Sequence, residues 1–397
     1  MKTKQQPSAQ ERNPAQKVQN TADFSGRDLY VGIDVHKQRW QVAVYHQGLV
    51  LSNISIESSS DLLVAHLRKL YPNASFHCAY ETSPWGFTLC RNLWAAGMHC
   101  IVVNAADIPG TDKERRSKTD RVDARKLAMH LAAGLLQPIH VPSERLQKQR
   151  SLIRLRKKIW ADLTRAKNRL KSELKFQGID IPKQFDNPHW SHNFLQWIEQ
   201  KANEDDDLKD TLLMMLEEVK LLRALLLKTE QKVRDLMRTD QFKHKSTLLR
   251  SIHGVGPLIA MLFLTEVGDV RRFRTFDQLN RFVGFCPDCH SSGEKNKDTG
   301  ITSRRHNLLR STLIEAAWQL IRRDPAMLEH YNNLKKRMKG QQAIIRIARK
   351  LLRRIRAVML TEEMYTCNTV QKQAVISAIK RPILRNPVAT AGGHRMQ

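Results

Sequence analysis

LYVGIDV, at residues 29–35, is a short apolar run that predicts a buried β-strand. Two more strand-like segments follow it, QVAVYH at 41–46 and GLVLSNISI at 48–56. Helical and strand patterns then alternate through 60–70, 76–81, 84–97, 99–105 and 118–134. Three strands followed by alternating helices and strands are typical of an α/β domain, so we expect one mixed sheet with helices over residues 28–140.

The composition indicates a globular protein with a polyanionic partner. The chain has 397 residues, which suits two or three domains, and its net charge is +28. Nucleic acid is the partner that this charge favours, because its phosphates release counterions to Lys and Arg. No apolar run approaches the ~18 residues of a membrane span, and the N-terminus lacks the apolar core of a signal peptide. Six scattered cysteines fit reduced thiols. We therefore expect a cytoplasmic, nucleoid-associated protein without a membrane partner.

The region 141–245 is expected to be helical and basic. Residues 145–176 contain twelve Lys or Arg with apolar residues between them, the pattern of a long basic amphipathic helix. We expect 180–203 to be irregular and a second long helix to begin at the acidic patch 204–207. The apolar positions of that helix approximate a heptad seam, which fits a helical hairpin, an intermolecular coiled coil or a plain bundle helix.

The region 246–365 is expected to form a mainly helical C-terminal domain, and the polar segments 1–27 and 366–397 to be disordered tails. Two apolar helices flank Gly254-Val255-Gly256, a pattern that fits either a phosphate-binding hairpin or an ordinary helix connection. Residues 304–356 carry fifteen Lys or Arg, and their basic amphipathic helix favours nucleic acid over a membrane surface.

Four carboxylates form a candidate metal site. Asp34 and Glu81 end two strands that we expect to be neighbours, and Asp120 and Asp123 lie three residues apart on one helix face. Such acids repel, by ~4 kcal/mol for one pair at 4 Å and an effective dielectric of 20. Mg²⁺ or Mn²⁺ relieves that repulsion, and two such ions stabilise the attacking and leaving oxygens of a phosphoryl displacement. Taken singly, each acid is better explained as a cap or a salt-bridge partner; taken together, they favour the metal site.

Three motifs carry a family resemblance: GIDVHK at 32–37, the strand end with ETSPWG at 81–86, and KTDRVDAR at 118–125. Together they resemble the Asp-Glu-Asp-Asp insertion-sequence transposases, which are guided by a bridge RNA and are related to the Piv-type DNA invertases. The similarity continues through SIHGVGPLIA, FVGF and GITSRRHNLLR in the C-terminal region. It implies a RuvC-like domain of the RNase H fold whose metal ligands are Asp34, Glu81, Asp120 and Asp123.

The resemblance also implies a nucleophilic serine in the C-terminal domain. FCPDCHSSGEKNKDTGIT, at 285–302, reads as a polar loop. The family places its serine before a Gly and five residues after a Pro, which selects Ser292 after Pro287, with Ser291 in reserve. Without the resemblance, two serines in a flexible loop would be the better explanation. The C-x-x-C-H pattern at 286–290 fits two free thiols better than haem or zinc.

Basic side chains near these motifs are the candidates for nucleic-acid contact. They are Arg154, Arg156, Lys157, Lys158, Arg165, Lys167, Arg304, Arg305, Arg310, Arg353 and Arg354.

The favoured hypothesis is a DNA recombinase of an insertion sequence that binds Mg²⁺ and forms a covalent serine–DNA intermediate. By resemblance, its partners are donor and target DNA, a structured noncoding guide RNA, and further copies of itself in a dimer or tetramer. The first alternative is a metal-dependent hydrolytic nuclease, such as a Holliday-junction resolvase, in which water attacks. The second is a non-catalytic basic protein that binds nucleic acid through its helices.

Overall fold

The computed structural model describes residues 23–82, 84–109, 119–187, 190–292 and 295–366, with the side chains of 288–300 left out. Most of the two expected tails therefore lies outside the described residues. The chain divides into two compact units, residues 1–141 and 142–397.

The first unit is built on a five-stranded sheet with the order β3-β2-β1-β4-β5. Its strands are β1 (Asp28–Val35), β2 (Arg39–His46), β3 (Leu49–Glu57), β4 (Ser75–Glu81) and β5 (His99–Val103). β1, β2 and β3 pair antiparallel, whereas β4 pairs parallel with both β1 and β5. The predicted mixed α/β sheet is confirmed.

Helices α1 (Ser60–Leu70) and α2 (Thr88–Ala95) cover one face of this sheet. Alternate strand residues, such as Leu29, Val31 and Ile33, join Leu63 and Leu93 of the two helices in one apolar core. The predicted start of the second helix was wrong: Pro84 lies in a turn, and α2 begins four residues later. A short 3₁₀ turn, η1 (Ala105–Asp107), follows β5.

Helix α4 (Asp120–Ala132) covers the opposite face, where the three inner strands carry the small residues Gly32, Ala43 and Ala79. Ala124 and Ala128 of α4 pack against Ala43 of β2. At Gly32, an added Cβ would come within 2.0 Å of the Ala124 carbonyl oxygen and 2.5 Å of the Ala128 nitrogen. Only glycine fits there, so the Gly of GIDVHK lets α4 lie directly on β1.

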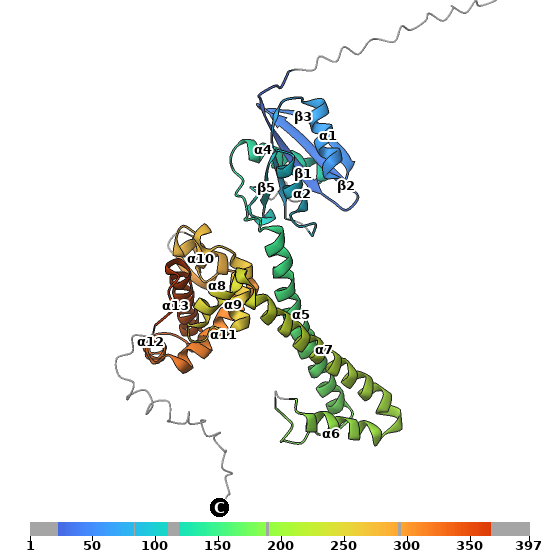
Figure 1. Cartoon of the computed structure of the whole chain (residues 1–397), viewed down its shortest axis with the longest axis vertical. Coiled ribbons are helices and arrows are strands. Elements are labelled where there is room, and N and C mark those ends of the chain that lie inside the picture. Colours follow the sequence, from blue (N-terminus) through green and yellow to red (C-terminus); the bar gives the residue numbers. More distant parts are fainter. Residues whose placement is uncertain (1–22, 83, 110–118, 188–189, 293–294, 367–397) are drawn as a thin grey trace, which may run out of the picture. The chain divides into compact units, whose positions relative to one another are not determined.

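The second unit begins with a helical hairpin. Helices α5 (Glu144–Phe176) and α7 (Asp206–Arg238) lie side by side (Figure 1), and α6 (His192–Asn203) packs on α7. Phe194 and Ile198 of α6 are fully buried in one apolar cluster with residues of both long helices. Both long helices were predicted, but the expectation of an irregular 180–203 was wrong, because α6 occupies its second half. The apolar seam of α7 packs within the chain, as a hairpin requires.

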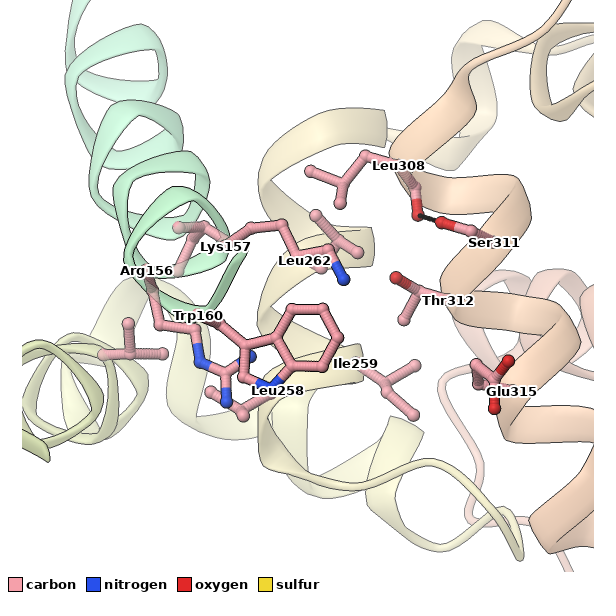
Figure 2. A pocket seen from close by; sticks show the side chains of 12 residues that line it. Arg156, Lys157, Trp160, Leu258, Ile259, Leu262, Leu308, Ser311, Thr312 and Glu315 are labelled. Atoms are coloured by element: carbon pink, nitrogen blue, oxygen red, sulfur yellow. Dashed lines mark hydrogen bonds between the residues drawn. The ribbon is translucent and has the colours of Figure 1, made fainter. Parts of the chain in front are cut away.

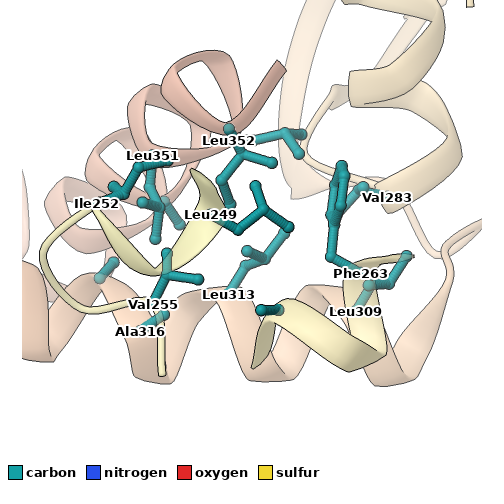
Figure 3. Close-up of a cluster of buried hydrophobic side chains, with 14 of the residues drawn as sticks. Leu249, Ile252, Val255, Phe263, Val283, Leu309, Leu313, Ala316, Leu351 and Leu352 are labelled. Carbon is teal, nitrogen blue, oxygen red and sulfur yellow. The ribbon is translucent and has the colours of Figure 1, made fainter. Parts of the chain in front are cut away.

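The rest of the second unit is a helical bundle around one large apolar core (Figure 3). Its helices are α8 (Asp240–Arg250), α9 (Pro257–Val267), α10 (Phe276–Val283), α11 (Asn307–Arg323), α12 (Pro325–Lys335) and α13 (Gly340–Thr361), with a 3₁₀ turn η2 (Val270–Arg272). Leu249, Val255, Phe263, Leu313 and Leu351 meet in this core.

The structure shows the conformation of the Gly254-Val255-Gly256 turn and of the segment 285–302. Gly254 has φ +86, and a Cβ there would lie 2.7 Å from the Ala316 carbonyl oxygen, so the Gly-Val-Gly turn packs closely against α11. The expected polar loop at 285–302 was wrong: its backbone forms an antiparallel hairpin of β6 (Pro287–Ser292) and β7 (Lys295–Ile301). Among the described residues, no helix has the length and apolar character to cross a membrane.

Candidate metal and nucleic-acid sites

Asp34 lies near the carboxyl end of β1, on the sheet face that α4 covers. Strand side chains alternate between faces, so Asp34 points to the same side as Gly32, which contacts α4. Its side chain is 23% exposed. The tight packing at Gly32 therefore brings the start of α4 beside Asp34.

Glu81 ends β4 on the same face. Its strand pairs parallel with β1, and the last matched pair is Ile33 with Tyr80, so Asp34 and Glu81 are the next residues on the two strands. Glu81 follows Ala79 by two residues, and Ala79 packs with Leu127 of α4. The register thus sets Asp34 and Glu81 at one edge of the sheet, under the same helix.

Asp120 and Asp123 lie in the first turn of α4, three residues apart. A polar link fixes this turn against the sheet: the Asn53 amide of β3 donates to the Arg121 carbonyl oxygen (2.9 Å) and accepts from the side chain of the nearly buried Gln41 (2.6 Å). The helix terminus is therefore held by hydrogen bonds as well as by packing.

His36 joins the acids, and sequence reasoning assigned it no role. Its Nε2 lies 3.0 Å from Asp34 Oδ2 and 3.6 Å from Asp120 Oδ2. One ligand atom from each of these three residues lies within 4.8 Å of the others. His36 lies two residues after Asp34 in the GIDVHK motif. The sequence feature that could have indicated its role is an imidazole directly after a strand that ends in an Asp.

The electrostatics of the cluster suit a bound cation. Burial raises the pKa of Asp34, hydrogen bonding and charge from His36 oppose that rise, and the carboxylates of Asp120 and Asp123 add to it. A carboxylate beside like charges gains most from a divalent cation, and carboxylate oxygens with an imidazole form a donor set for Mg²⁺ or Mn²⁺. The residues present therefore fit a hard divalent metal.

Two hollows adjoin the cluster and share His36 and Lys37. One, of about 470 Å³, runs past Arg39, Ser55 and Asp120. The other, of about 300 Å³, is lined by Trp40, Tyr80 and Trp85 among others. Lys37 and Arg39 offer positive charge beside the acids, as a site that receives a phosphate would require.

Ser292 lies at the end of β6, where its backbone pairs with Lys295, and Ser291 pairs with Asn296. The side chains of both serines and residue Gly293 lie outside the described part of the structure. The hairpin is anchored at its base, since the Thr302 amide donates to the Cys286 carbonyl oxygen (3.0 Å). Arg310 also donates to the Thr302 carbonyl oxygen (2.7 Å).

Several of the candidate nucleic-acid contacts are bonded within the fold. Arg354 donates to the fully buried Asp324 (2.6 Å), and its own side chain is 18% exposed. Arg156 pairs with Glu230, and Arg165 with Asp162. Those charges are committed to intramolecular partners in the structure.

Other candidates lie over aromatic rings or at the surface. The Lys157 nitrogen is 4.0 Å from the centre of the Trp160 ring, and Lys167 and Arg353 lie over Trp190 and Phe276. Lys158, Arg304 and Arg305 are exposed, and Arg305 donates to the Asn307 side chain (3.2 Å).

A buried ionic cluster around Glu266 was missed by sequence reasoning. The Glu266 side chain is 1% exposed and receives two hydrogen bonds from Arg154, at 2.7 and 2.8 Å. Nδ1 of His306 accepts the Leu309 amide, so its Nε2 carries the proton that is donated to Glu266 (3.1 Å). Burial would raise the pKa of Glu266, but His306 and Arg154 outweigh it and lower that pKa to about 2. Glu266 lies near the end of the mostly apolar helix α9. The spacing of residues along that helix gives no indication that Arg154 and His306, which are distant in sequence, pair with it.

Comparison with known proteins connects both units to transposases. The transposase family model of the IS110 DEDD type matches residues 31–177, which include all four candidate acids. The model for the transposase IS116/IS110/IS902 family matches residues 246–332, which include the β6–β7 hairpin. Together the two models cover more than half of the chain.

Individual relatives agree with the family models. A putative transposase of Sinorhizobium fredii, y4qE, is 28% identical over 307 residues, covering 75% of this chain and 72% of its own. The transposase for insertion sequence element IS1533 of Leptospira borgpetersenii is 26% identical over 299 residues, covering 74% and 85%. The transposase for insertion sequence element IS1111A of Coxiella burnetii is 33% identical over 130 residues, 30% of this chain and 34% of its own. With both family domains present in one chain, this protein belongs to the IS110/IS116 family of insertion-sequence transposases.

Proposed function

We propose that this transposase cuts and rejoins DNA with a divalent-metal site held by Asp34, Glu81, Asp120 and Asp123. The observation that carries the proposal is the convergence of Asp34 and Asp120 on His36 at the sheet edge where Glu81 also ends. Bound Mg²⁺ or Mn²⁺ would stabilise negative charge on the attacking and leaving oxygens of the phosphate. Lys37 and Arg39 would hold the DNA phosphate beside the acids.

We assign Ser292 as the nucleophile. Its hydroxyl oxygen would form a bond to the scissile phosphorus and give up its proton, and one bridging oxygen of the DNA strand would leave and take up a proton. The phosphodiester is conserved in the protein–DNA adduct, so a strand end can later displace the serine and rejoin the DNA. The position of Ser292 next to the hairpin tip, in the matched C-terminal domain, supports the assignment.

The domain division that we propose is a RuvC-like domain at 28–140, a basic helical region at 141–245 and a C-terminal transposase domain at 246–365. The five-stranded mixed sheet, with acids ending neighbouring strands, supports a RuvC-like first domain and a relation to Piv-type invertases. The basic surface of α5 supports binding of a structured guide RNA in the cytoplasm, near the nucleoid.

We further propose that the protein acts as a dimer or tetramer in which the serine of one subunit completes the acidic site of another. The α7 face that bears Met214, Leu221 and Leu225 supports this, since all three side chains are exposed. That face would form the coiled coil between subunits.

Substitutions at the acids and the serines test the proposal. Asp34→Asn and Ser292→Ala should each abolish recombination between a donor and a target plasmid, and Ser292→Ala should also abolish the covalent protein–DNA adduct. Ser291→Ala is the matched control and should keep both. An adduct that persists in Ser292→Ala would reassign the nucleophile, and metal-dependent cutting without any adduct would show a hydrolytic nuclease instead. DNA binding with no cutting by the wild type would favour an architectural protein.

A further inference from the structure

The second unit contains a hollow that no catalytic step uses. It has a volume of about 570 Å³ and lies between α5, α9 and α11 (Figure 2). Leu258, Ile259 and Leu262 of α9 and Leu308 of α11 form apolar walls. A largely apolar cavity of this size with a few polar groups is typical of a ligand site.

Two side chains of α5 give the hollow the chemistry of a base-stacking site. Trp160 is 42% exposed, which is unusual for an indole beside so much buried surface. Lys157 extends across the hollow and places its ammonium 4.0 Å from the centre of that ring. Exposed aromatic rings next to cations are how proteins bind unpaired nucleotides, by stacking the base and pairing the phosphate.

The opposite wall, on α11, carries hydrogen-bonding groups. Ser311, Thr312 and Glu315 line it, and Glu315 interacts electrostatically with Lys157. A carboxylate here would repel a phosphate but would accept hydrogen bonds from the amino group of a base. The two walls are thus complementary to the two ends of a nucleotide.

The cation that serves the hollow is Lys157 rather than Arg156. Arg156 also lines the hollow, but its guanidinium pairs with Glu230 of α7. Lys157 instead rests on the ring, and when a base stacks there it can exchange this cation–π contact for an ion pair with the phosphate.

We propose that this hollow binds one unpaired nucleotide of a DNA or RNA strand, with the base stacked on Trp160, its amino group at Glu315 and its phosphate at Lys157. The inference rests on the proposed action on nucleic acid. A duplex keeps its bases stacked on one another, so it cannot fill the hollow.

Fluorescence anisotropy of labelled oligonucleotides with the full chain, without divalent metal, tests the proposal. Trp160→Ala should weaken binding of single-stranded dC12 or rC12 by about tenfold and leave binding of a duplex of equal length unchanged. Trp160→Phe should restore most of the affinity. Phe176→Ala is the matched control, because Phe176 is an aromatic residue of the same helix, 82% exposed and outside the hollow. A loss confined to dC12 or to rC12 identifies which strand is bound.

Glu315→Gln tests the base contact. The wild type should prefer dC12 to dT12, because cytosine offers an amino group where thymine has a carbonyl. An amide can also donate, so Glu315→Gln should lose that preference.

Three results would overturn the proposal. Trp160→Ala could leave single-strand binding intact, it could weaken single-strand and duplex binding equally, or it could change the oligomeric mass by light scattering, which would show that a second copy fills the hollow. The binding assay involves no cleavage, so the proposed nucleotide site can be refuted while Asp34→Asn still abolishes recombination. Conversely, the nucleotide site can be supported while Asp34→Asn leaves recombination intact, so the two proposals are tested separately.

Discussion

Gly32 sets the distance between α4 and the sheet, and with it the positions of Asp120 and Asp123. Gly32→Ala would place a methyl group 2.0 Å from the Ala124 carbonyl oxygen, so α4 must shift. We expect a loss of about 1–3 kcal/mol in the free energy of unfolding, as for an overpacked core, and weaker metal binding. Urea denaturation and calorimetric Mn²⁺ titration measure the two effects.

Gly256→Ala is the matched control, because a Cβ there meets nothing within 4 Å and the residue has no positive φ. Its stability should stay within about 1 kcal/mol of the wild type. Equal stability of Gly32→Ala and wild type would contradict the close packing of α4.

The depressed pKa of Glu266 predicts an acid-dependent loss of stability. The folded value is about 2 and the ordinary value 4.5, so the ionised form stabilises the fold fully above pH 4.5 and this contribution is lost as the pH falls toward 2. The difference corresponds to about 3 kcal/mol.

Glu266→Gln removes this titration and leaves Arg154 and Arg150 without their carboxylate. The variant should be less stable than wild type at pH 7, by about 3–5 kcal/mol as for a broken buried pair. The gap should narrow between pH 4.5 and pH 2, as measured by chemical denaturation across that range. A gap that is constant with pH would refute the assignment of a low pKa to Glu266.

At the scale of elements, the strands and long helices could be predicted because their signals are local. SDLLVAHLRKL predicted α1 at its observed bounds, and the basic run at 145–176 predicted α5 to within one residue at its start. Hydrophobic period and capping residues such as Ser59 and Ser143 suffice for this. The alternation of the strands also indicated which acids end at one edge of the sheet.

The elements that were missed depend on contacts distant in sequence. Helix α6 was read as irregular, and its Phe194 and Ile198 become buried only in the apolar cluster that they form with residues of α5 and α7. The strands β6 and β7 are mostly polar and show no apolar alternation, so nothing in their periodicity indicated a hairpin. The role of His36 depended on α4 folding back over β1 to bring Asp120 to it.

The contact between α12 and α13 predicts that Arg354 stabilises the fold and does not bind nucleic acid. Asp324 caps α12 by accepting the Met327 amide (3.1 Å) and also pairs with Arg354 of α13. Arg354→Ala leaves the buried Asp324 carboxylate without its cationic partner, so it should cost about 3–5 kcal/mol of stability. Lys158→Ala, at an exposed position, should leave stability unchanged and weaken nucleic-acid binding. Thermal unfolding and a nucleic-acid binding titration of both variants separate a structural role from a binding role. If Arg354→Ala is as stable as the wild type, Arg354 does not have the structural role.

At the scale of the whole molecule, the net charge of +28 predicts binding that falls steeply with salt. Each phosphate neutralised on duplex DNA contributes a slope of about −0.9 to log K against log salt. Replacing the acids Asp34 and Asp120 by Asn removes negative charge, so metal-free DNA binding should tighten slightly even though recombination is lost. Filter binding from 50 to 300 mM KCl measures this. Weaker DNA binding by the two Asn variants would contradict this expectation, because it would mean that the carboxylates themselves help to hold the DNA.

The central claim is that acids from two strands and one helix gather to hold a divalent cation. Isothermal titration of Mn²⁺ into the wild type and into Asp34→Asn, Asp120→Asn and Asp61→Asn tests it most directly, with Asp61 as the matched acid in the first turn of α1. We predict that the wild type and Asp61→Asn bind Mn²⁺ alike and that Asp34→Asn and Asp120→Asn lose at least tenfold in affinity. Equal Mn²⁺ affinity in all four proteins would contradict the claim.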